Sequence, residues 1–283
     1  MKKVLHTGLF LALLLIFTSL PTYAANIQIK IDGIAITSDV NPEVKNNRTL
    51  VPLRVISENL GAKVNWSDAE VTLTKDDMKV VLKLNSNTAL KNGKTIMLDV
   101  KPSMKNNRTM VPLRFIAETF GCNVNYKNSI VTVDTDPLMI NGVKVKAMQE
   151  EYHMTMGGVV QQIKGNAYNK AIYNIFVENK GSKVEAPANY SWQYNIDIPG
   201  YYYKTGQYDF LNSEGNSIKR FDIYTLVKSF PDETLAEYPE VLIYDATENQ
   251  WYLFNDAAVQ SINELVDTAF KNGFLKNVSN TVV

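Results

Sequence analysis

A segment of about 60 residues occurs twice in this 283-residue chain, and this duplication constrains the fold more than any other feature of the sequence. Residues 45–73 (KNNRTLVPLRVISENLGAKVNWSDAEVTL) and 105–133 (KNNRTMVPLRFIAETFGCNVNYKNSIVTV) align without gaps and are identical at 16 of 29 positions. The match extends toward the N-terminus, where the pattern around Gly33 returns around Gly93. The N-terminal half is therefore expected to contain two copies of one structural unit.

Each copy predicts a β-hairpin followed by a helix. An Asp-Gly pair at 32–33 and an Asn-Gly pair at 92–93 favour tight hairpin turns. In the first copy, a β-prone run leads to Pro52, which suits the first turn of a helix, and Gly61 suits the end of that helix. Short strands are expected to follow. Each unit should thus combine antiparallel strands with one short helix, which is an α+β arrangement.

The most strongly repeated positions are interpreted as structural. Arg54 and Glu58 are four residues apart, so they share one face of the first helix, and the second helix repeats the pair. Such a pair is more simply a surface ion pair than a catalytic carboxylate held by an Arg. Arg48 and its counterpart Arg108 follow Asn-Asn turns, where they are expected to bond loop carbonyls or to pair with an acid. The motif residues are Arg48, Pro52, Arg54, Glu58, Gly61, Arg108, Pro112, Arg114, Glu118 and Gly121.

The N-terminus predicts a secretory signal peptide over residues 1–25. Lys2 and Lys3 precede an apolar run of about 13 residues, which is shorter than the roughly 20 that a membrane helix needs. No other stretch is apolar enough to span a bilayer, so no integral membrane segment is expected after cleavage. Cleavage would leave 27 basic and 29 acidic residues with no basic patch, and nucleic-acid binding is not expected. The protein should be secreted or associated with the cell envelope.

The duplicated string resembles the copper amine oxidase N-terminal-like domain, also called the stalk domain, of exported proteins of Gram-positive bacteria. The resemblance covers about residues 27–134 and rests on the pattern R-T-x-V-P-L-R-x-I-x-E-x-x-G, which occurs twice with the same spacing. It implies an antiparallel sheet wrapped on a helix, in a domain often joined to extracellular or wall-associated modules. The domain is named for an appendage of the oxidase and not for its chemistry.

The oxidase chemistry is excluded by the residue inventory. The resemblance implies three His on copper and a quinone derived from the Tyr of an Asn-Tyr-acidic motif, and copper in such a site prefers imidazole nitrogen. Only His153 remains after removal of the signal peptide, and Asn189-Tyr190 is followed by Ser191. Cys122, the single Cys, aligns with Ala62 and is interpreted as a small core residue. We therefore expect no cofactor and no metal.

The chain is expected to divide into a signal peptide (1–25), a duplicated stalk-type domain (26–135) and a second α+β domain (136–283) that ends in a helix. An Asn-Gly turn at 141–142 predicts a further hairpin. Strands are expected over 159–162, 171–177, 221–227, 241–244 and 251–254. The final helix is predicted from Ala257 to about Lys271, after a cap at Asn255-Asp256 and before Gly273. Its apolar face is expected to carry Val259, Ile262, Val266, Ala269 and Phe270.

An aromatic segment of the C-terminal half is the candidate ligand face. Tyr190, Trp192 and Tyr194 alternate with other residues, so on a strand they would share one face. An exposed row of this kind would stack on the sugar rings of a wall glycan. A buried row would form a core face with Tyr hydroxyls at its edge. Both interpretations stay open at this point.

The sequence predicts an exported, non-enzymatic protein that acts in adhesion, spacing or recognition at the cell envelope, with a cell-wall glycan or another envelope protein as its partner. The alternative is a hydrolase of cell-wall polymers with its site in the C-terminal domain. Its candidate carboxylates are Glu237, Glu240, Asp245 and Glu248. Their spacing does not place any two at the roughly 5 to 9 Å that glycoside hydrolysis needs, and surface charge is the simpler interpretation.

Overall fold

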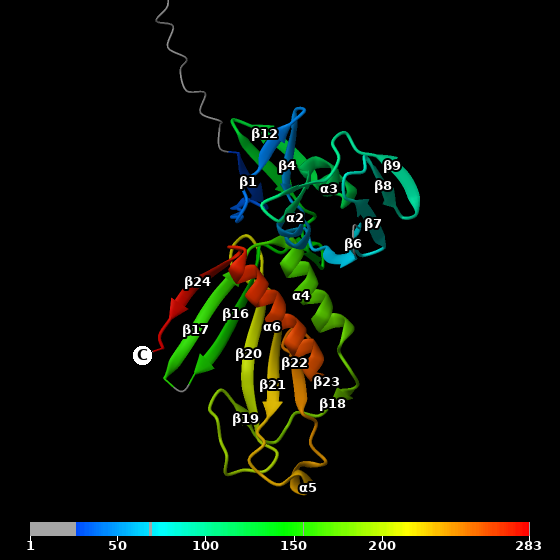
Figure 1. Cartoon of the computed structure of the whole chain (residues 1–283). Coiled ribbons are helices and arrows are strands. Elements are labelled where there is room, and N and C mark those ends of the chain that lie inside the picture. The colour runs from blue at the N-terminus through cyan, green and yellow to red at the C-terminus, as the bar shows by residue number, and fades with distance from the viewer. Residues whose placement is uncertain (1–26, 68–69, 155, 283) are drawn as a thin grey trace, which may run out of the picture.

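The computed structural model describes residues 27–67, 70–154 and 156–282, so the predicted signal peptide lies outside the described residues. The structure is α+β with mostly antiparallel sheets, as predicted. Figure 1 shows several small sheets around two short helices in the upper part and one large sheet with two long helices in the lower part. Within the described residues, no helix combines the length and the apolar character that crossing a membrane requires.

The upper part contains both repeats. The first comprises β1 (Gln28–Ile31), β2 (Ile34–Ala35), β3 (Glu43–Lys45), β4 (Arg48–Pro52), α2 (Leu53–Asn59), β5 (Lys63–Ser67), β6 (Glu70–Lys75) and β7 (Met78–Lys83). The second comprises β8 (Thr88–Lys91), β9 (Lys94–Met97), β10 (Ser103–Lys105), β11 (Arg108–Pro112), α3 (Leu113–Thr119), β12 (Asn123–Lys127) and β13 (Ile130–Asp134). The predicted hairpin turns are present, with φ of 51° at Asp32 and 46° at Asn92, in the left-handed region that such turns require.

The two repeats exchange strands. One sheet has the order β12-β13-β1-β2, so the last hairpin of the second repeat pairs with the first hairpin of the first repeat. Another has the order β5-β6-β7-β8-β9 and joins the last strands of the first repeat to the first hairpin of the second. Because each sheet is completed by the other repeat, the expectation of two tandem units is not confirmed.

Equivalent strands of the two repeats meet at the centre of a third sheet, whose order is β10-β11-β4-β3. β4 and β11 are antiparallel, and Val51 lies opposite Val111, its counterpart 60 residues later. Both Val side chains are fully buried. An approximate two-fold axis therefore passes between Val51 and Val111 and relates one repeat to the other.

Two ion pairs follow the same symmetry. Arg48 binds Asp99 at 2.7 Å, and Arg108 binds Asp39 at 2.6 Å. Nη1 of each Arg also donates to the carbonyl of the preceding Asn, at 3.3 and 3.4 Å. Each repeat thus supplies one Arg and one Asp to the other. Since the side chains are about half exposed, each pair contributes roughly 0 to 1 kcal/mol.

The helices of the repeats have the predicted surface pairs. Nε of Arg54 lies 3.8 Å from Oε1 of Glu58, and the counterpart distance on α3 is 3.6 Å. Gly61 and Gly121 follow the helices with φ of 82° and 76°, as helix ends of this kind require. Cys122 is buried, as predicted, and its burial raises the pKa of its thiol to about 11.

The lower part is built on a nine-stranded sheet in the order β18-β23-β22-β21-β20-β16-β17-β24, with β19 beside β20. Helices α4 and α6 lie across one face of this sheet (Figure 1). The elements are β14 (Met139–Ile140), β15 (Val143–Lys144), β16 (Ala147–Met154), β17 (Gly157–Ile163), α4 (Asn166–Glu178), β18 (Lys183–Val184), β19 (Tyr190–Ser191), β20 (Tyr202–Leu211), β21 (Ser217–Leu226), α5 (Asp232–Leu235), β22 (Val241–Asp245), β23 (Gln250–Phe254), α6 (Asp256–Lys271) and β24 (Leu275–Asn280).

Two predictions for this part are wrong. Residues 171–177 were expected to form a strand, but they lie in α4. The β-prone composition of this stretch hides a helical period, because Tyr168, Ile172 and Phe176 recur every four residues and are buried against the sheet. Phe270 was expected on the apolar face of α6 but is 65% exposed. The buried stripe of α6 starts instead at Ala258, and Phe270 lies outside it.

The remaining predictions for α6 are confirmed. The Asn255 side chain accepts a hydrogen bond from the backbone N of Ala258 at 2.8 Å, which caps the start of the helix. Gly273 follows the helix with φ of 81°. The Asn-Gly hairpin at 141–142 and the strands predicted over 159–162, 241–244 and 251–254 also occur, within one or two residues. The strand predicted over 221–227 also occurs, but it begins four residues earlier, at Ser217.

One hydrophobic core extends through both parts of the molecule. It includes Ile31 and Val111 from the repeats together with Ile172 and Phe221 from the lower part. The domain boundary predicted between residues 135 and 136 stays a prediction, since no break in the core marks it. Buried Tyr168 of α4 reinforces the contact, because its hydroxyl donates to Oδ1 of Asn59 at 2.8 Å. Burial raises the pKa of this Tyr to about 12.

Asp32 connects three segments at the junction of the two parts. Its Oδ1 accepts from the backbone N of Thr135 at 2.9 Å, and its Oδ2 accepts from Oγ1 of Thr135 at 2.8 Å. Oδ2 also accepts from the backbone N of Asn166, at 2.9 Å. One carboxylate therefore holds together the first hairpin turn, the end of β13 and the start of α4.

We predict that Asp32→Ala lowers the free energy of unfolding by about 3 kcal/mol, because three donors lose a charged acceptor. Asp32→Asn is the matched control, since Asn92 occupies the equivalent turn in the second repeat. The Asn side chain preserves the turn and part of the hydrogen bonding. The decrease in the free energy of unfolding for Asp32→Asn should therefore be at most half of that for Asp32→Ala. Urea unfolding measures both values. Equal losses for the two variants would contradict the role assigned to the carboxylate.

Candidate functional site

The large sheet has a second face, opposite α4 and α6, which we call the outer face. On β21, Phe221 and Ile223 point into the core under the helices. Because side chains alternate along a strand, Arg220, Asp222 and Tyr224 belong to the outer face. Neighbouring strands add Lys204, Gln207 and Asp209 from β20 and Glu151 and His153 from β16, as the strand register requires.

A buried charged network lies at the centre of the outer face. Asp222 is 1% exposed and binds Nζ of Lys204 at 2.8 Å. Nε and Nη2 of Arg220 donate to the two oxygens of the same carboxylate, at 2.8 and 2.7 Å. Burial lowers the pKa of Lys204, although its hydrogen bond to Asp222 opposes this shift. The hydrogen bond to Asp222 raises the pKa of Arg220. The carboxylate is thus shared between two cations.

Trp192 covers this network from the segment that precedes β20. Its ring stacks on His153, with a centroid distance of 4.1 Å and an interplanar angle of 11°. Nζ of Lys204 lies 4.4 Å from the Trp192 ring centroid, which is a cation–π contact. Nε2 of His153 is in turn 2.8 Å from Oε1 of Glu151. Trp192 is therefore fixed between β16 and β20.

The three aromatic residues predicted as a ligand face are brought to the same end of the sheet, but not as one strand. Only Tyr190 belongs to β19, where it packs edge-on to Trp251 at 4.9 Å between ring centroids. Tyr194 contacts Tyr203 edge-on at 5.5 Å. Tyr190 is 44% and Tyr194 is 64% exposed. In this segment Trp192 is therefore held by its contacts with His153 and Lys204, whereas Tyr190 before it and Tyr194 after it are exposed.

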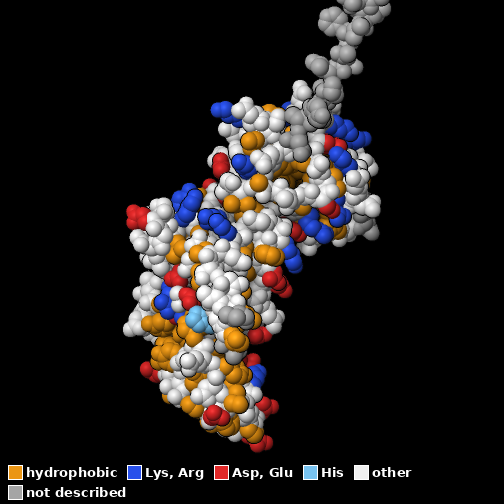
Figure 2. Space-filling view, turned by 90° about the vertical axis from the view of Figure 1, so that its left-hand side faces the viewer, with side chains coloured by type: hydrophobic (Ala, Val, Ile, Leu, Met, Phe, Trp, Pro, Cys, Tyr) orange, Lys and Arg blue, Asp and Glu red, His pale blue; other side chains and the backbone are white. Residues whose placement is uncertain are grey.

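Other exposed hydrophobic side chains belong to this end of the lower part. Ile196 is 57% exposed, and Met154 and Met156, at the turn after β16, are 55% and 62% exposed. Figure 2 shows hydrophobic side chains gathered over the lower part of the molecule on the face that it presents. The charged network of the outer face is therefore bordered by apolar surface.

Sequence reasoning did not identify the charged residues of the outer face. Arg220 and Asp222 alternate with the apolar Phe221 and Ile223 along the strand, and this alternation was the available signal. Lys204 lies in a Tyr-rich stretch where nothing in the sequence marks it as buried. Its pairing with Asp222 depends on the register of β20 against β21, which includes a bulge near Thr205.

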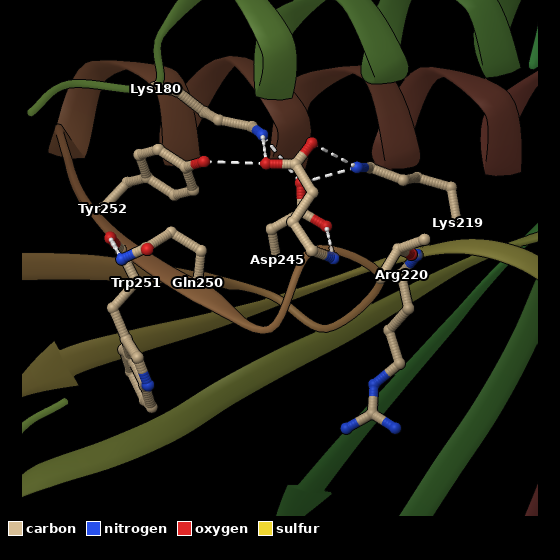
Figure 3. A network of polar contacts seen from close by, with 9 residues as sticks. Lys180, Lys219, Arg220, Asp245, Gln250, Trp251 and Tyr252 are labelled. Atoms are coloured by element: carbon tan, nitrogen blue, oxygen red, sulfur yellow. Dashed lines mark hydrogen bonds and ion pairs between the residues drawn. The ribbon is translucent and has the colours of Figure 1, made fainter. Parts of the chain in front are cut away.

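Two of the four candidate carboxylates of the hydrolase alternative, Asp245 and Glu248, share two lysines on the opposite side of the sheet. Figure 3 shows Asp245 with Lys180 and Lys219. Nζ of Lys180 and Nζ of Lys219 lie 2.7 and 2.6 Å from Oδ2 of Asp245. The same ammonium groups lie 3.2 and 3.0 Å from the Glu248 carboxylate. The network ties the segment after α4 to β21 and to the β22–β23 turn.

The electrostatics of this network oppose general acid catalysis. The Tyr252 hydroxyl donates to Glu248 at 2.7 Å, and this bond, followed by that from Lys219, lowers the pKa of Glu248 to about 2. A carboxyl group with so low a pKa carries no proton to donate near neutral pH. Of the other two candidates, Glu240 pairs with Lys228 at the surface and Glu237 is exposed. Asp245 and Glu248 therefore belong to a structural network, whereas Glu237 and Glu240 lie at the surface.

The segment from β1 to β13, which contains both repeats, matches the model of a known family. Residues 30–135 match the copper amine oxidase N-terminal domain. Members of this family are non-catalytic, stalk-like domains. The match confirms the resemblance predicted from the repeated string. No curated protein and no solved structure matches the chain. In the part of the chain that the structure describes, no group of three or more His, Cys, Asp or Glu is arranged to hold a metal ion. We refer to residues 30–135 as the stalk domain.

We predict that Asp222→Ala lowers the free energy of unfolding by about 3 to 5 kcal/mol, because Lys204 and Arg220 would be left without their buried counter-ion. Lys204→Met is the matched control. It removes a buried cation, whereas Asp222 keeps both hydrogen bonds from Arg220, so the loss should be clearly smaller. Chemical denaturation of both variants measures the difference. A larger loss for Lys204→Met would show that Asp222 is not the centre of the network.

We predict that the Glu248 network makes stability depend on acid pH. The folded-state pKa of about 2 lies below the ordinary value of 4.5. The contribution of Glu248 is therefore complete above about pH 4.5 and is lost as the pH falls toward 2. Glu248→Gln should be less stable than the wild type at pH 7, and the two should converge near pH 2. Thermal unfolding between pH 2 and 7 tests this, and a gap that stays constant would contradict it.

Proposed function

We propose that the protein is exported and acts without catalysis in recognition at the bacterial cell envelope. In this proposal the outer face of the large sheet binds a cell-wall glycan, and the stalk domain spaces that surface from its attachment. The observation that carries the proposal is the pair of exposed rings, Tyr190 and Tyr194, next to a charged network. Export is supported by the signal peptide predicted from residues 1–25.

The exposed rings are held in place before any ligand arrives. Tyr190 is supported edge-on by Trp251 and Tyr224, and Tyr194 by Tyr203. An aromatic ring fixed in this way loses little conformational entropy on binding. Its flat face suits the CH-rich face of a pyranose, and the Tyr hydroxyl offers a hydrogen bond at the edge.

Polar groups beside the rings suit the hydroxyl groups of a sugar. The Arg220 side chain is 37% exposed and is oriented by its two bonds to Asp222. His153 and Glu151 are 35% and 30% exposed and are bonded to each other. Together they supply donors and acceptors on a rigid sheet, which is the arrangement that a polar ligand recognises.

The stalk domain suits a spacing role through its connection to the sheet. The shared core and the bonds of Asp32 to Thr135 and Asn166 fix the start of α4 to the stalk domain. A surface carried on α4 and the sheet is therefore presented at a fixed orientation. The hydrolase alternative draws no support from Asp245 and Glu248, because two lysines neutralise both carboxylates.

We predict that Tyr194→Ala weakens binding of the processed protein to purified peptidoglycan and wall polysaccharides by about tenfold, which corresponds to about 1.4 kcal/mol for one stacked ring. Phe270→Ala is the matched control, because Phe270 is 65% exposed, against 64% for Tyr194, and lies on α6, away from the outer face. Co-sedimentation with the insoluble wall fraction measures binding.

Two results would overturn the proposal. If wild type and Tyr194→Ala bind equally, or if Phe270→Ala weakens binding as much, the outer face is not the recognition surface. If the wild-type protein releases soluble fragments from the wall material, the protein is a hydrolase. The same assay detects both outcomes.

A further inference from the structure

The stalk domain has two grooves at positions related by its approximate two-fold axis. One, of about 300 Å³, is lined by Arg48 and Val44 of the first repeat and by Arg114 and Tyr126 of the second. The other, of about 530 Å³, is lined by the counterparts of these four residues, 60 positions away: Arg108, Met104, Arg54 and Trp66. Two hollows built from equivalent residues are a product of the strand exchange and not a local irregularity.

Each groove combines one exposed ring with two guanidinium groups. Tyr126 is 54% and Trp66 is 42% exposed, on strands in which only Val124 and Val64 pack partly against the core. The four Arg side chains are between 41% and 59% exposed. Rings of this size left half open at the same place in both repeats offer flat apolar surface to a ligand.

The two arginines of each groove differ in how closely they are paired. Arg48 and Arg108 hold Asp99 and Asp39 at 2.7 and 2.6 Å. Two arginines and no acid line the first, and two arginines and Asp39 line the second. The ion pairs of Arg54 and Arg114 with the neighbouring Glu are long, at 3.8 and 3.6 Å. A guanidinium has five N–H donors in a planar fork that matches carboxylate and phosphate groups. Each groove therefore has one loosely paired guanidinium, that of Arg114 in the first and of Arg54 in the second, and its N–H donors favour an anionic ligand.

We propose that each groove binds one ring of an anionic polysaccharide. The sugar ring stacks on Trp66 or Tyr126, and its carboxylate or phosphate group binds the guanidinium group of Arg54 or Arg114 in the same groove. This site is separate from the outer face and does not depend on the proposed function. Because two grooves lie on one rigid domain, a long polymer engages both and binds more tightly than a fragment that fills one.

The test uses the full processed chain and four soluble polymers. Polygalacturonate carries a carboxylate on every ring, and phosphomannan carries phosphate on its rings. Methyl-esterified polygalacturonate has the rings without the charge, and polyglycerol phosphate has the charge without the rings. We expect binding to at least one of the first two, and binding at least about tenfold weaker to each of the last two. Which of the first two binds more tightly identifies the acidic group.

Variants then locate the site. Trp66→Ala and Tyr126→Ala should each weaken polymer binding by about tenfold, and the double variant by about 100-fold. Met97→Ala is the control, since Met97 is 67% exposed on β9 and lines neither groove. Phe270→Ala, on α6 and outside both grooves, should also leave this binding unchanged. Circular dichroism and thermal unfolding establish that each variant is folded.

The proposal is overturned if the double variant binds as the wild type does, or if Met97→Ala loses as much. It is also overturned if neither ring-bearing acidic polymer binds. Equal binding of polyglycerol phosphate would show charge attraction without ring recognition. Equal binding of the methyl ester would show that the arginines do not select for charge.

Discussion

The pairing of β4 with β11 is the interaction on which the rest of the stalk domain depends. Because Val51 lies opposite Val111, the symmetry axis of the domain passes through a pair of equivalent residues. The exchanged hairpins, the reciprocal pairs of Arg48 with Asp99 and of Arg108 with Asp39, and the two grooves all follow from this register. A slip of one residue would turn the buried Val side chains to the other face and remove the symmetry.

The local structure of the repeats could be predicted from the sequence because it depends on short-range chemistry. The turns at Asp32-Gly33 and Asn92-Gly93, the helix ends at Gly61 and Gly121 and the Arg54–Glu58 pair are all encoded within a few residues. The strand exchange could not be predicted. Two nearly identical units satisfy the same hydrophobic pattern whether a hairpin pairs within its own repeat or with the other, and the sequence pattern is identical in both cases.

The candidate site also has a part that the sequence predicts and a part that it does not. The aromatic segment at 190–194 is visible in the sequence as composition, but its support by Trp251, Tyr203 and His153 comes from residues far away in the chain. The charged centre requires that Lys204 and Asp222 meet across β20 and β21, and a bulge in β20 sets that register. The helix at 166–178 was missed because its β-prone residues favour a strand, whereas packing under α6 selects the helical period.

The parallel pairing of β1 with β13 has a mechanical consequence for a domain of this kind. These are the first and the last strand of the stalk domain in the sequence. They pair in parallel, with residues 28–31 opposite residues 130–133. A pull on the preceding and following chain therefore acts on the start of β1 and the end of β13, which lie at opposite ends of the ladder. Such a pull loads the two strands in shear, so that all hydrogen bonds of the ladder bear the force together and none of them breaks before the others.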